Sequence, residues 1–231
     1  MRAPDFICAG AQKSGTTWLY AQVSRHPQVF MREKELNYFY RDLPLSWYSE
    51  KFIDATEEQR CGDISPNYAA FVGLAERIFA ACPSSLLLHL LRNPVERAFS
   101  QWKMARYFSN IPREIPFIEA FRENLQYMRR RGEYSVILEE YARFYPLGDR
   151  LAVFWYDDIK TRPVELMREI LTYLRLDPDW EPRDAHSVVG PGLEQADIAM
   201  QDALEVAAYY APFDRRLCSL LGISSLPWPV G

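Results

Sequence analysis

The hydrophobic and polar positions of this chain follow two patterns. Four short apolar runs, each flanked by loop-forming residues, predict buried strands at 5–9, 59–64, 86–91 and 151–155. Elsewhere apolar residues recur at helical spacing, as in the segment that begins at Pro94. Helices are expected at 15–25, 66–81, 94–108, 117–131, 135–145, 163–174 and 195–221, the last of them broken near Pro212.

The order of these elements predicts the fold class. Strands that alternate with helices indicate an α/β protein of three layers, in which a mostly parallel sheet has helices on both faces. The 231 residues suffice for a single domain, 1–231, and their 48% hydrophobic content favours a globular chain over a disordered one. Ligands of such sheets bind beyond the carboxyl ends of the strands, so the residues that follow each strand are the candidates for chemistry.

Charge and cysteine content narrow the possible partners. The formal net charge of −4 argues against a general nucleic-acid or anionic-membrane binder. The longest strongly apolar run, 86–91, is too short to span a bilayer. A functional loop so close to Met1 leaves no room for a signal peptide, so a cytoplasmic protein is expected. The cysteines and histidines are scattered without ligand spacing, and no metal site is expected.

A glycine-bounded octapeptide, Gly10 to Thr17, follows the first predicted strand and precedes a helical segment. Gly10 and Gly15 have the spacing of a nucleotide-binding P-loop, whose backbone N–H groups and following helix N-terminus hold a phosphate. The sequence departs from that motif at Thr16, where a P-loop has lysine, because the lysine of this loop is Lys13. We therefore expect a P-loop-like fold that binds a phosphate-like anion. The loop sequence supports a nucleoside triphosphate with magnesium less well as its ligand.

A second anion site is predicted where the run 86–91 ends. Arg92 follows this run, and Pro94 begins the next helix. The guanidinium is a planar fork that suits phosphate, and Ser100, further along the helix, is placed to present a hydroxyl to the same anion. In isolation Arg92 is equally well explained by a surface ion pair, and Ser100 alone is better explained without a ligand. Combined with the octapeptide, the two residues predict a ligand that carries anions at two separated points.

These motifs resemble those of the sulfotransferases that use 3′-phosphoadenosine 5′-phosphosulfate (PAPS). The segment Lys13-Ser14-Gly15-Thr16-Thr17-Trp18-Leu19 is similar to their 5′-phosphosulfate loop, and Arg92 with Ser100 is similar to their 3′-phosphate element. Segments at 25–29, 34–39, 63–68 and 156–160 resemble landmarks of the bacterial and heparan-sulfate-type branch. The resemblance therefore extends over the whole chain.

The resemblance implies transfer of a sulfuryl group from PAPS to a hydroxyl or amine, which leaves adenosine 3′,5′-bisphosphate (PAP). Lys13 is expected at the bridging oxygen, where a close ion pair is worth about 4 kcal/mol at an effective dielectric near 20. The 5′-phosphate is expected to be held by backbone and hydroxyl groups of Ser14, Gly15, Thr16 and Thr17. Trp18 has two interpretations, stacking on adenine or packing on the sheet.

Glu35 is the predicted general base. In the heparan-sulfate-type branch, the glutamate of a Lys-Glu-hydrophobic-x-aromatic-Phe segment takes the acceptor's proton, and Glu35 matches that position. By spacing alone Glu35 would be a surface acid in a run of mixed charge. Within this run Glu33 is the nearest competitor, and Lys34 is a candidate to steady the sulfuryl group or Glu35.

Histidines are the alternative, because other sulfotransferase branches use a histidine base. His26, beside a proline, and His89, in an apolar strand, are interpreted as structural residues. His186 is a minor alternative to Glu35. Residues 183–192 are a candidate for the loop that closes over the nucleotide in relatives, although they match its basic, glycine-rich pattern poorly.

Three further segments have two interpretations each. Gly132-Glu133-Tyr134 either contacts the acceptor or cofactor, or forms a helix boundary with a packed tyrosine. The basic run 128–131 either attracts an anionic acceptor or is a solvated helix end. An aromatic group follows Glu35: Tyr38, Phe39, Tyr40, Trp47 and Tyr48. Part of this group is a candidate lining of an acceptor cleft, but most of its rings are expected in the core.

Two other functions stay open at this point. A P-loop kinase predicts a lysine directly before Thr17 and a magnesium-binding aspartate, for which Asp63 is the candidate. A non-catalytic nucleotide-binding module on the same fold predicts binding without transfer. For an enzyme, the short chain favours a small molecule, a lipid headgroup or a tailored metabolite as acceptor over a long polysaccharide.

Overall fold

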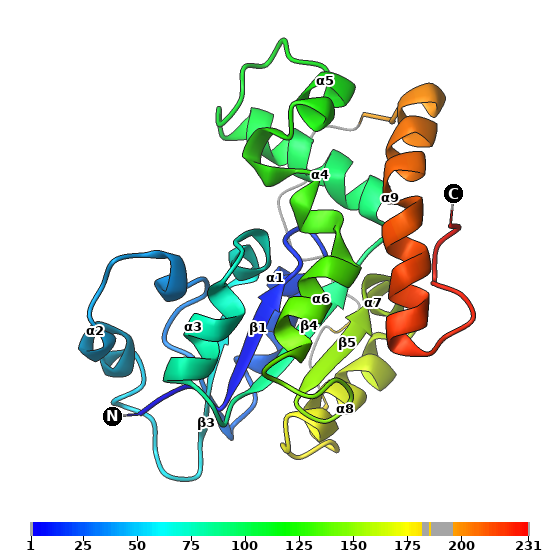
Figure 1. The fold of residues 1–231 in the computed structure, drawn as a ribbon. Coiled ribbons are helices and arrows are strands. Elements are labelled where there is room, and N and C mark those ends of the chain that lie inside the picture. Colours follow the sequence, from blue (N-terminus) through cyan, green and yellow to red (C-terminus); the bar gives the residue numbers. More distant parts are fainter. Residues whose placement is uncertain (1, 182–184, 186–195, 231) are drawn as a thin grey trace.

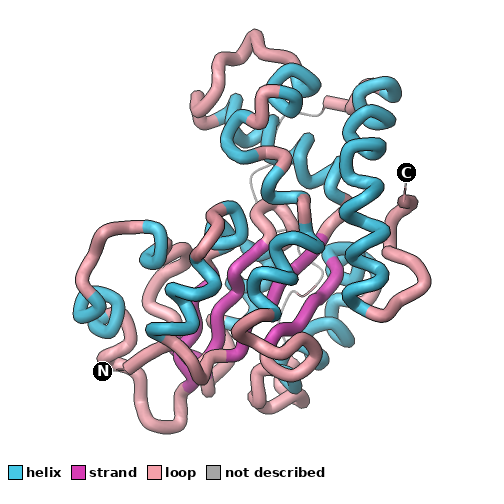
Figure 2. Tube along the Cα trace, viewed as in Figure 1, coloured by secondary structure: helices cyan, strands magenta, loops and turns pink. Residues whose placement is uncertain are grey.

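The structure, a computed structural model, describes residues 2–181, 185 and 196–230. At its centre lies a five-stranded sheet with the order β2-β3-β1-β4-β5, in which every pairing is parallel. The predicted α/β class and parallel sheet are confirmed (Figure 1, Figure 2). The strands are β1 (Phe6–Gly10), β2 (Val29–Phe30), β3 (Arg60–Ile64), β4 (Leu86–Leu91) and β5 (Leu151–Trp155).

Helices cover both faces of the sheet and complete the three layers. One face is covered by α3 (Leu74–Ala81) and α6 (Tyr134–Ala142), and the other by α1 (Thr16–Val23) and α8 (Pro163–Tyr173). Beyond the carboxyl ends of the strands, a helical part packs around its own apolar cluster (Figure 1). It contains α4 (Pro94–Tyr107), α5 (Phe117–Arg122) and the first half of α9 (Met200–Leu221). Of the helices in the described residues, none is both long and apolar enough to cross a membrane.

Alternation along each strand explains why the strand sequences are continuous apolar runs. In β1, Ile7 and Ala9 pack toward α3 and α6, whereas Phe6 and Cys8 pack toward α1 and α8, and all four are buried. Side chains of a strand point alternately to its two faces, so a strand covered on both sides is apolar at every position. This is why the sequence predicts β1 and β4 to within a residue or two.

The connections around β1 create a crevice at the carboxyl ends of the strands. After β1 the chain forms β2 and β3 on one side of it, and then crosses to β4 and β5 on the other side. At such a point the loops after two neighbouring strands leave toward opposite faces of the sheet, and ligands bind between them. Here these are the loops after β1 and β4, which carry Lys13 and Arg92.

Some predicted helices are shorter than expected because the backbone turns left-handed. The helix expected at 66–81 is divided, since Gly73 has a φ of 83° between a 3-10 turn at Pro66–Ala70 and α3. The helix expected at 117–131 ends at Arg122, because Asn124 has a φ of 52° and 3-10 turns follow. Among the strands and α-helices of the described residues, three short ones had no sequence prediction: β2, α2 (Leu45–Glu50) and α7 (Tyr156–Thr161).

The prediction of a helix break near Pro212 is wrong, because α9 continues through this residue. Proline removes one N–H from the helical ladder, which weakens the helix at that turn. Buried residues on both sides of the proline hold the helix in place: Tyr210 packs in the cluster with α4 and α5, and Leu217 packs in the cluster over the sheet. Tertiary packing thus outweighs the local preference to break.

Candidate active site

The loop between β1 and α1 places Lys13 at the carboxyl end of β1. Lys13 and Gly15 have left-handed backbone, with φ of 71° and 90°. Only glycine fits at position 15, because a Cβ there would lie 2.3 Å from Cδ1 of Ile159. The N–H of Leu19 donates to the carbonyl of Gly15 at 3.0 Å, so the N–H groups of residues 16–18 precede the hydrogen-bonded ladder of α1. Together with the helix dipole, these N–H groups favour an anion in front of the loop.

Lys13 is a partly buried cation beside other cations. Its Nζ contacts Sδ of Met104 on α4 at 3.5 Å. Burial lowers the pKa of Lys13, and the charges of Arg92 and Lys34 lower it further, whereas Glu35 raises it. A bound anion would act in the opposite direction, since a nearby negative charge favours the ammonium form. The surroundings of Lys13 are therefore electropositive.

Arg92 lies beside this loop, at the carboxyl end of β4. Its Nη1 donates to the backbone carbonyl of Lys13 at 3.3 Å, and its guanidinium lies 4.4 Å from the ring centre of Tyr156. Nε and Nη2 both donate to Oε2 of Glu96, at 3.1 and 2.8 Å, in an ion pair whose glutamate is half exposed. The hydroxyl of Tyr134 donates to the Arg92 carbonyl at 2.8 Å and fixes its backbone. The two predicted anion elements thus lie at one crevice.

Ser100 lies on the face of α4 that looks toward these two cations. Residues four apart on a helix share a face, so Glu96, Ser100 and Met104 lie in one row. Arg92 contacts Glu96 and Lys13 contacts Met104, which places Ser100 between the two contacts. Its contact with a phosphate stays a prediction.

Glu35 lies across the crevice from α4, next to the carboxyl end of β3. Its N–H donates to the carbonyl of Ile64 at 3.0 Å, and its φ of 62° is unusual for a residue with a side chain. Its Oε1 accepts a hydrogen bond from Nζ of Lys34 at 2.5 Å, and about a third of the side chain is exposed. The competitor Glu33 instead pairs with Lys51 at 2.6 Å, with half of its side chain exposed. Of these two glutamates, Glu35 is the one whose charge acts on Lys13.

The other loop residues differ in exposure. Ser14 and Thr16 are buried and Thr17 is exposed. Within the described part of the chain, Oγ of Ser14 has no hydrogen-bond partner. The indole of Trp18 is 3% exposed, packs in the cluster with α8 and donates from Nε1 to the carbonyl of Ala185 at 2.8 Å. This supports the packing interpretation of Trp18, while its contact with adenine stays a prediction.

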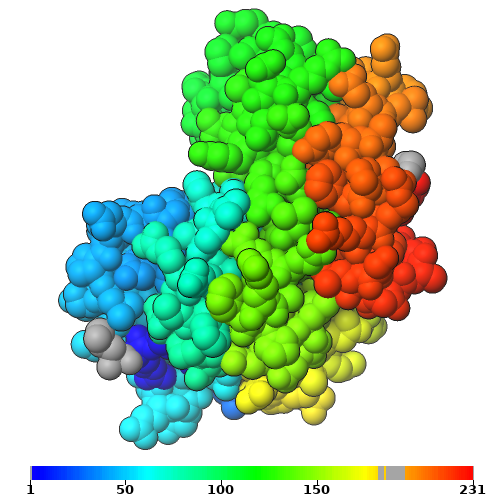
Figure 3. All heavy atoms as spheres, in the orientation of Figure 1, coloured from blue at the N-terminus to red at the C-terminus, as the bar shows by residue number. Residues whose placement is uncertain are grey.

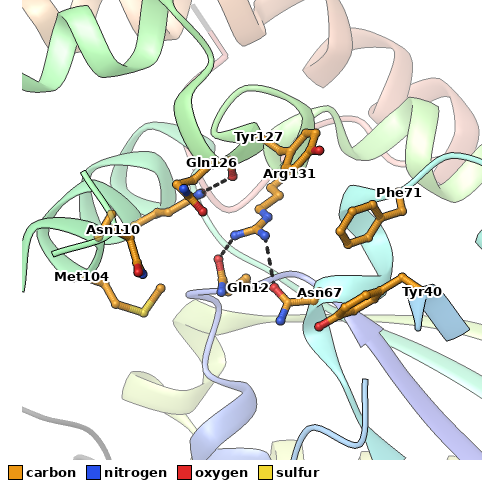
Figure 4. Close-up of a pocket in the computed structure, with 11 residues that line it drawn as sticks. Gln12, Tyr40, Asn67, Phe71, Met104, Asn110, Gln126, Tyr127 and Arg131 are labelled. Atoms are coloured by element: carbon orange, nitrogen blue, oxygen red, sulfur yellow. Dashed lines mark hydrogen bonds between the residues drawn. The ribbon is translucent and has the colours of Figure 1, made fainter. Parts of the chain in front are cut away.

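A cavity of about 280 Å³ adjoins the loop where β1, α4 and the segment before α6 meet. It lies where the cyan part of the chain meets the green part, and the surface is indented between these parts (Figure 3). Arg131 points to its floor and donates to Oε1 of Gln12 and, at 3.1 Å, to Oδ1 of Asn67 (Figure 4). The remaining lining is polar amide and aromatic or apolar: Tyr40, Phe71, Gln101, Met104, Ala105, Asn110, Gln126 and Tyr127.

Sequence reasoning identified only part of this cavity. Arg131 belongs to the basic run 128–131, whose other arginines point elsewhere: Arg129 lies over Tyr209, and Arg130 pairs with Glu133 and Glu140. Gln12 belongs to the octapeptide and Asn67 to the segment 63–68, but neither was predicted to line an acceptor cavity. Of the aromatic group after Glu35, Tyr40 lines the cavity, and Tyr38, Phe39 and Tyr48 are buried in the core, as expected from the sequence.

Asp63, the candidate magnesium ligand of the kinase alternative, is not available to bind a metal at the crevice. Asp63 is fully buried, and its carboxylate accepts hydrogen bonds from Ser65 Oγ at 2.6 Å, Tyr48 hydroxyl at 2.8 Å and Tyr68 hydroxyl at 2.9 Å. Burial raises the pKa of Asp63 against the effect of these bonds. A carboxylate enclosed in this way supports the aromatic core under Glu35 and does not face the crevice.

The two described histidines are structural, as expected. His26 is buried, with Nε2 3.2 Å from the carbonyl of Asp177 and Nδ1 accepting from the N–H of Gln28 at 3.1 Å. His89 is buried in β4, and burial lowers its pKa to about 3, so it is neutral. Its Nε2 has no partner among the described residues, which departs from the expected satisfied core residue. His186, and all of 183–192 except Ala185, lie outside the described residues.

The segment Gly132-Glu133-Tyr134 forms a packed helix boundary. Tyr134 is buried and begins α6, and Glu133 accepts a hydrogen bond from the Tyr209 hydroxyl at 2.7 Å. A Cβ at Gly132 would lie 2.7 Å from the ring of Tyr210. Through its bond to the Arg92 carbonyl, Tyr134 also positions a residue of the crevice.

Comparisons with known proteins agree with the geometry. The membrane-associated sulfotransferase kil1 of Dictyostelium discoideum is 38% identical over 105 residues, 43% of this chain and 22% of that protein. Human heparan sulfate glucosamine 3-O-sulfotransferase 6 is 30% identical over 162 residues, 66% of this chain and 46% of that protein. The chain therefore spans less than half the length of these relatives.

Solved structures share the fold. The crystal structure of a sulfotransferase from Alicyclobacillus acidocaldarius superposes with a TM-score of 0.84 at 24% identity, over 97% of this chain and 98% of that one. A mouse sulfotransferase complexed with PAP gives 0.51 at 16% identity, over 90% of this chain and 64% of that one. In sequence, residues 3–187 match the family described as sulfotransferase domain. Because this match covers most of the 231 residues, the chain belongs to the sulfotransferase domain family.

Proposed function

We propose that this protein transfers a sulfuryl group from PAPS to a hydroxyl or amine of a small acceptor and releases PAP. The observation that carries this proposal is the convergence of Lys13, Arg92 and Glu35 on one crevice, at the carboxyl ends of β1, β4 and β3. Family membership and the solved neighbour that holds PAP support the donor.

The residues of the crevice fit a doubly anionic nucleotide. The loop of Lys13 combines N–H groups at the start of α1 with a cation whose pKa is lowered by burial and by its cationic neighbours. The buried hydroxyl of Ser14 lacks a partner among the described residues, and the guanidinium of Arg92 supplies a second cation beside the loop. Two anionic ends of one molecule would neutralise both positive regions.

PAPS supplies the sulfuryl group and a phosphate leaving group. Glu35 takes the acceptor's proton as the new bond to sulfur forms, and Lys34 holds the carboxylate in place. Lys13 neutralises the charge that grows on the oxygen released by sulfur. Arg92 and Ser100 hold the distant phosphate and contribute through positioning.

The function is tested by comparing nucleotides in thermal unfolding. Saturating PAP is expected to raise the unfolding temperature by roughly 5–10 °C, because a ligand at one hundred times its Kd adds about 2.7 kcal/mol. ATP with magnesium is expected to raise it less, since Asp63 is enclosed in the core. A larger shift with ATP and magnesium would favour a kinase.

Arg92→Ala is expected to weaken PAP binding by about 1.5–3 kcal/mol, the range for a hydrogen bond to a charged group. Isothermal titration calorimetry with PAP measures the change. Because Arg92 also pairs with Glu96, Glu96→Gln is the matched control. This control removes the ion pair and leaves the guanidinium free, so it should keep or tighten PAP binding. Equal weakening in both variants would contradict a direct contact, because PAP affinity would then depend on the ion pair between Arg92 and Glu96.

A further inference from the structure

The cavity beside the loop has an uncompensated positive charge at its floor. Of the described residues that line it, Arg131 is the only one with a charged side chain. Arg131 is 8% exposed, so its guanidinium is largely withdrawn from water. Withdrawal of an ion from water is costly unless an opposite charge or a full set of hydrogen bonds replaces the water.

Among the described residues, the hydrogen-bond partners of this guanidinium are neutral groups. Its Nη atoms donate to the side-chain oxygens of Gln12 and Asn67, and Nε has no partner in the part of the chain that the structure describes. The nearby Arg97 is fully buried and is also bound by neutral oxygens, those of Gln101 and Met128. Burial and the charge of Arg97 lower the pKa of Arg131 to about 10.

The carboxylate whose charge acts on Arg131, that of Glu35, already forms an ion pair with another residue. Glu35 acts electrostatically on Arg131, yet its Oε1 is held by Lys34 at 2.5 Å. No ion pair to Arg131 or Arg97 is found among the described residues. The cavity therefore offers one unmatched guanidinium to whatever enters it.

Aromatic rings form a wall of the same cavity. The rings of Tyr40 and Phe71 are 4.8 Å apart, and those of Phe71 and Tyr127 are 5.5 Å apart. Rings in such a wall favour a flat ligand, which stacks against them or meets them edge-on. Figure 4 shows this wall beside the guanidinium, which points at Gln12 and Asn67.

We propose that the acceptor of this protein is a small planar molecule with a singly charged acidic group, of which a carboxylate is the simplest, and that Arg131 binds that group. A carboxylate and a guanidinium match in shape and form two parallel hydrogen bonds. The ring lies along Tyr40 and Phe71, and the hydroxyl or amine faces Glu35 and Lys13. The inference rests on the proposed function in one respect: that function is the reason for calling the ligand an acceptor.

The transfer to such an acceptor balances without a further reactant. The acceptor oxygen or nitrogen forms a bond to sulfur while the bond between sulfur and the phosphate oxygen breaks, and the leaving oxygen keeps that electron pair. The proton of the acceptor passes to Glu35. The acidic group on Arg131 takes no part in bond changes and fixes the orientation of the reacting hydroxyl.

Binding of a matched pair of probes tests the inference. 4-Hydroxybenzoate carries the acid, and 4-hydroxybenzamide is its neutral counterpart of nearly the same shape. Titration calorimetry with each probe, with and without PAP, is expected to give a Kd roughly 10- to 100-fold lower for the acid. Arg131→Gln is expected to abolish this difference while the Kd for PAP is unchanged.

Arg129→Gln is the matched control, because Arg129 is in the same basic run but lies over Tyr209. This variant should keep the preference for the acid. Equal affinity for acid and amide, failure of both to bind, or a preference that survives Arg131→Gln would each overturn the inference. If the wild-type protein did not bind PAP, the proposed donor would be overturned instead. The titrations without PAP would still test the cavity in that case.

Discussion

Replacement of Glu35 by glutamine is expected to lower kcat for sulfuryl transfer by roughly 10²- to 10⁴-fold, the range for loss of a general base. The physical reason is the position of Glu35 at the crevice, where its charge acts on Lys13 and its carboxylate is steadied by Lys34. Glutamine has nearly the same shape but cannot take a proton. Release of PAP from PAPS in the presence of an acceptor gives the rate, and calorimetry with PAP should give an unchanged Kd.

Glu33→Gln is the control for this prediction. Glu33 lies in the same mixed-charge run but pairs with Lys51 on the exposed side, so this variant should be as active as the wild type. If Glu35→Gln also kept full activity, another group would have to be the base. A protein that binds PAP but gives no transfer in either form would be a non-catalytic binding module.

Lys13→Met is expected to lower kcat by roughly 10²- to 10³-fold, the usual loss when one group that stabilises developing negative charge is removed. Lys13 lies in the loop with its Nζ against Met104, and methionine fills similar space without the charge. Its effect on kcat should exceed its effect on the Kd for PAP, because the charge on the leaving oxygen grows in the transition state. Single-turnover kinetics with PAPS separate the two effects.

Lys103→Met is the control for Lys13→Met. Lys103 belongs to α4, and its charge also acts on Lys13, so the control removes a nearby cation without touching the loop. Its effect on kcat should be small. If Lys103→Met and Lys13→Met lowered kcat equally, a diffuse field rather than a contact of Lys13 would be responsible.

Four of the strands and the loops of Lys13 and Arg92 were predictable because their signals are local. The run at 86–91 is apolar on both faces, and Arg92 follows it directly, so strand, strand end and cation could be read together. Gly15 has the left-handed backbone that favours glycine, and a Cβ at Gly10 would lie 2.7 Å from Cβ of Ala69. By contrast, β2 has only two residues, too few for a pattern, and the positive φ of Asn124 ends a helix that its apolar spacing alone would continue.

The cavity was only partly predictable because its residues come from distant segments. Gln12, Asn67 and Arg131 meet through the fold, and the motifs that contain the two amides, 10–17 and 63–68, do not indicate that these side chains line one cavity. The basic run 128–131 was visible in the sequence. Which of its arginines points inward depends on the turn after Asn124, whose Oδ1 accepts from the N–H of Arg129 at 2.8 Å. Tertiary contacts therefore decide which residues line the cavity, whereas local motifs mark the loops after β1 and β4.

A crystal structure with bound PAP tests the central claim most directly. The account predicts one PAP molecule in the crevice between β1 and β4, with its 5′-phosphate at the loop of Lys13 and its 3′-phosphate at Arg92. A PAP molecule that reached only one of these two cations, or that bound at another surface, would contradict the account.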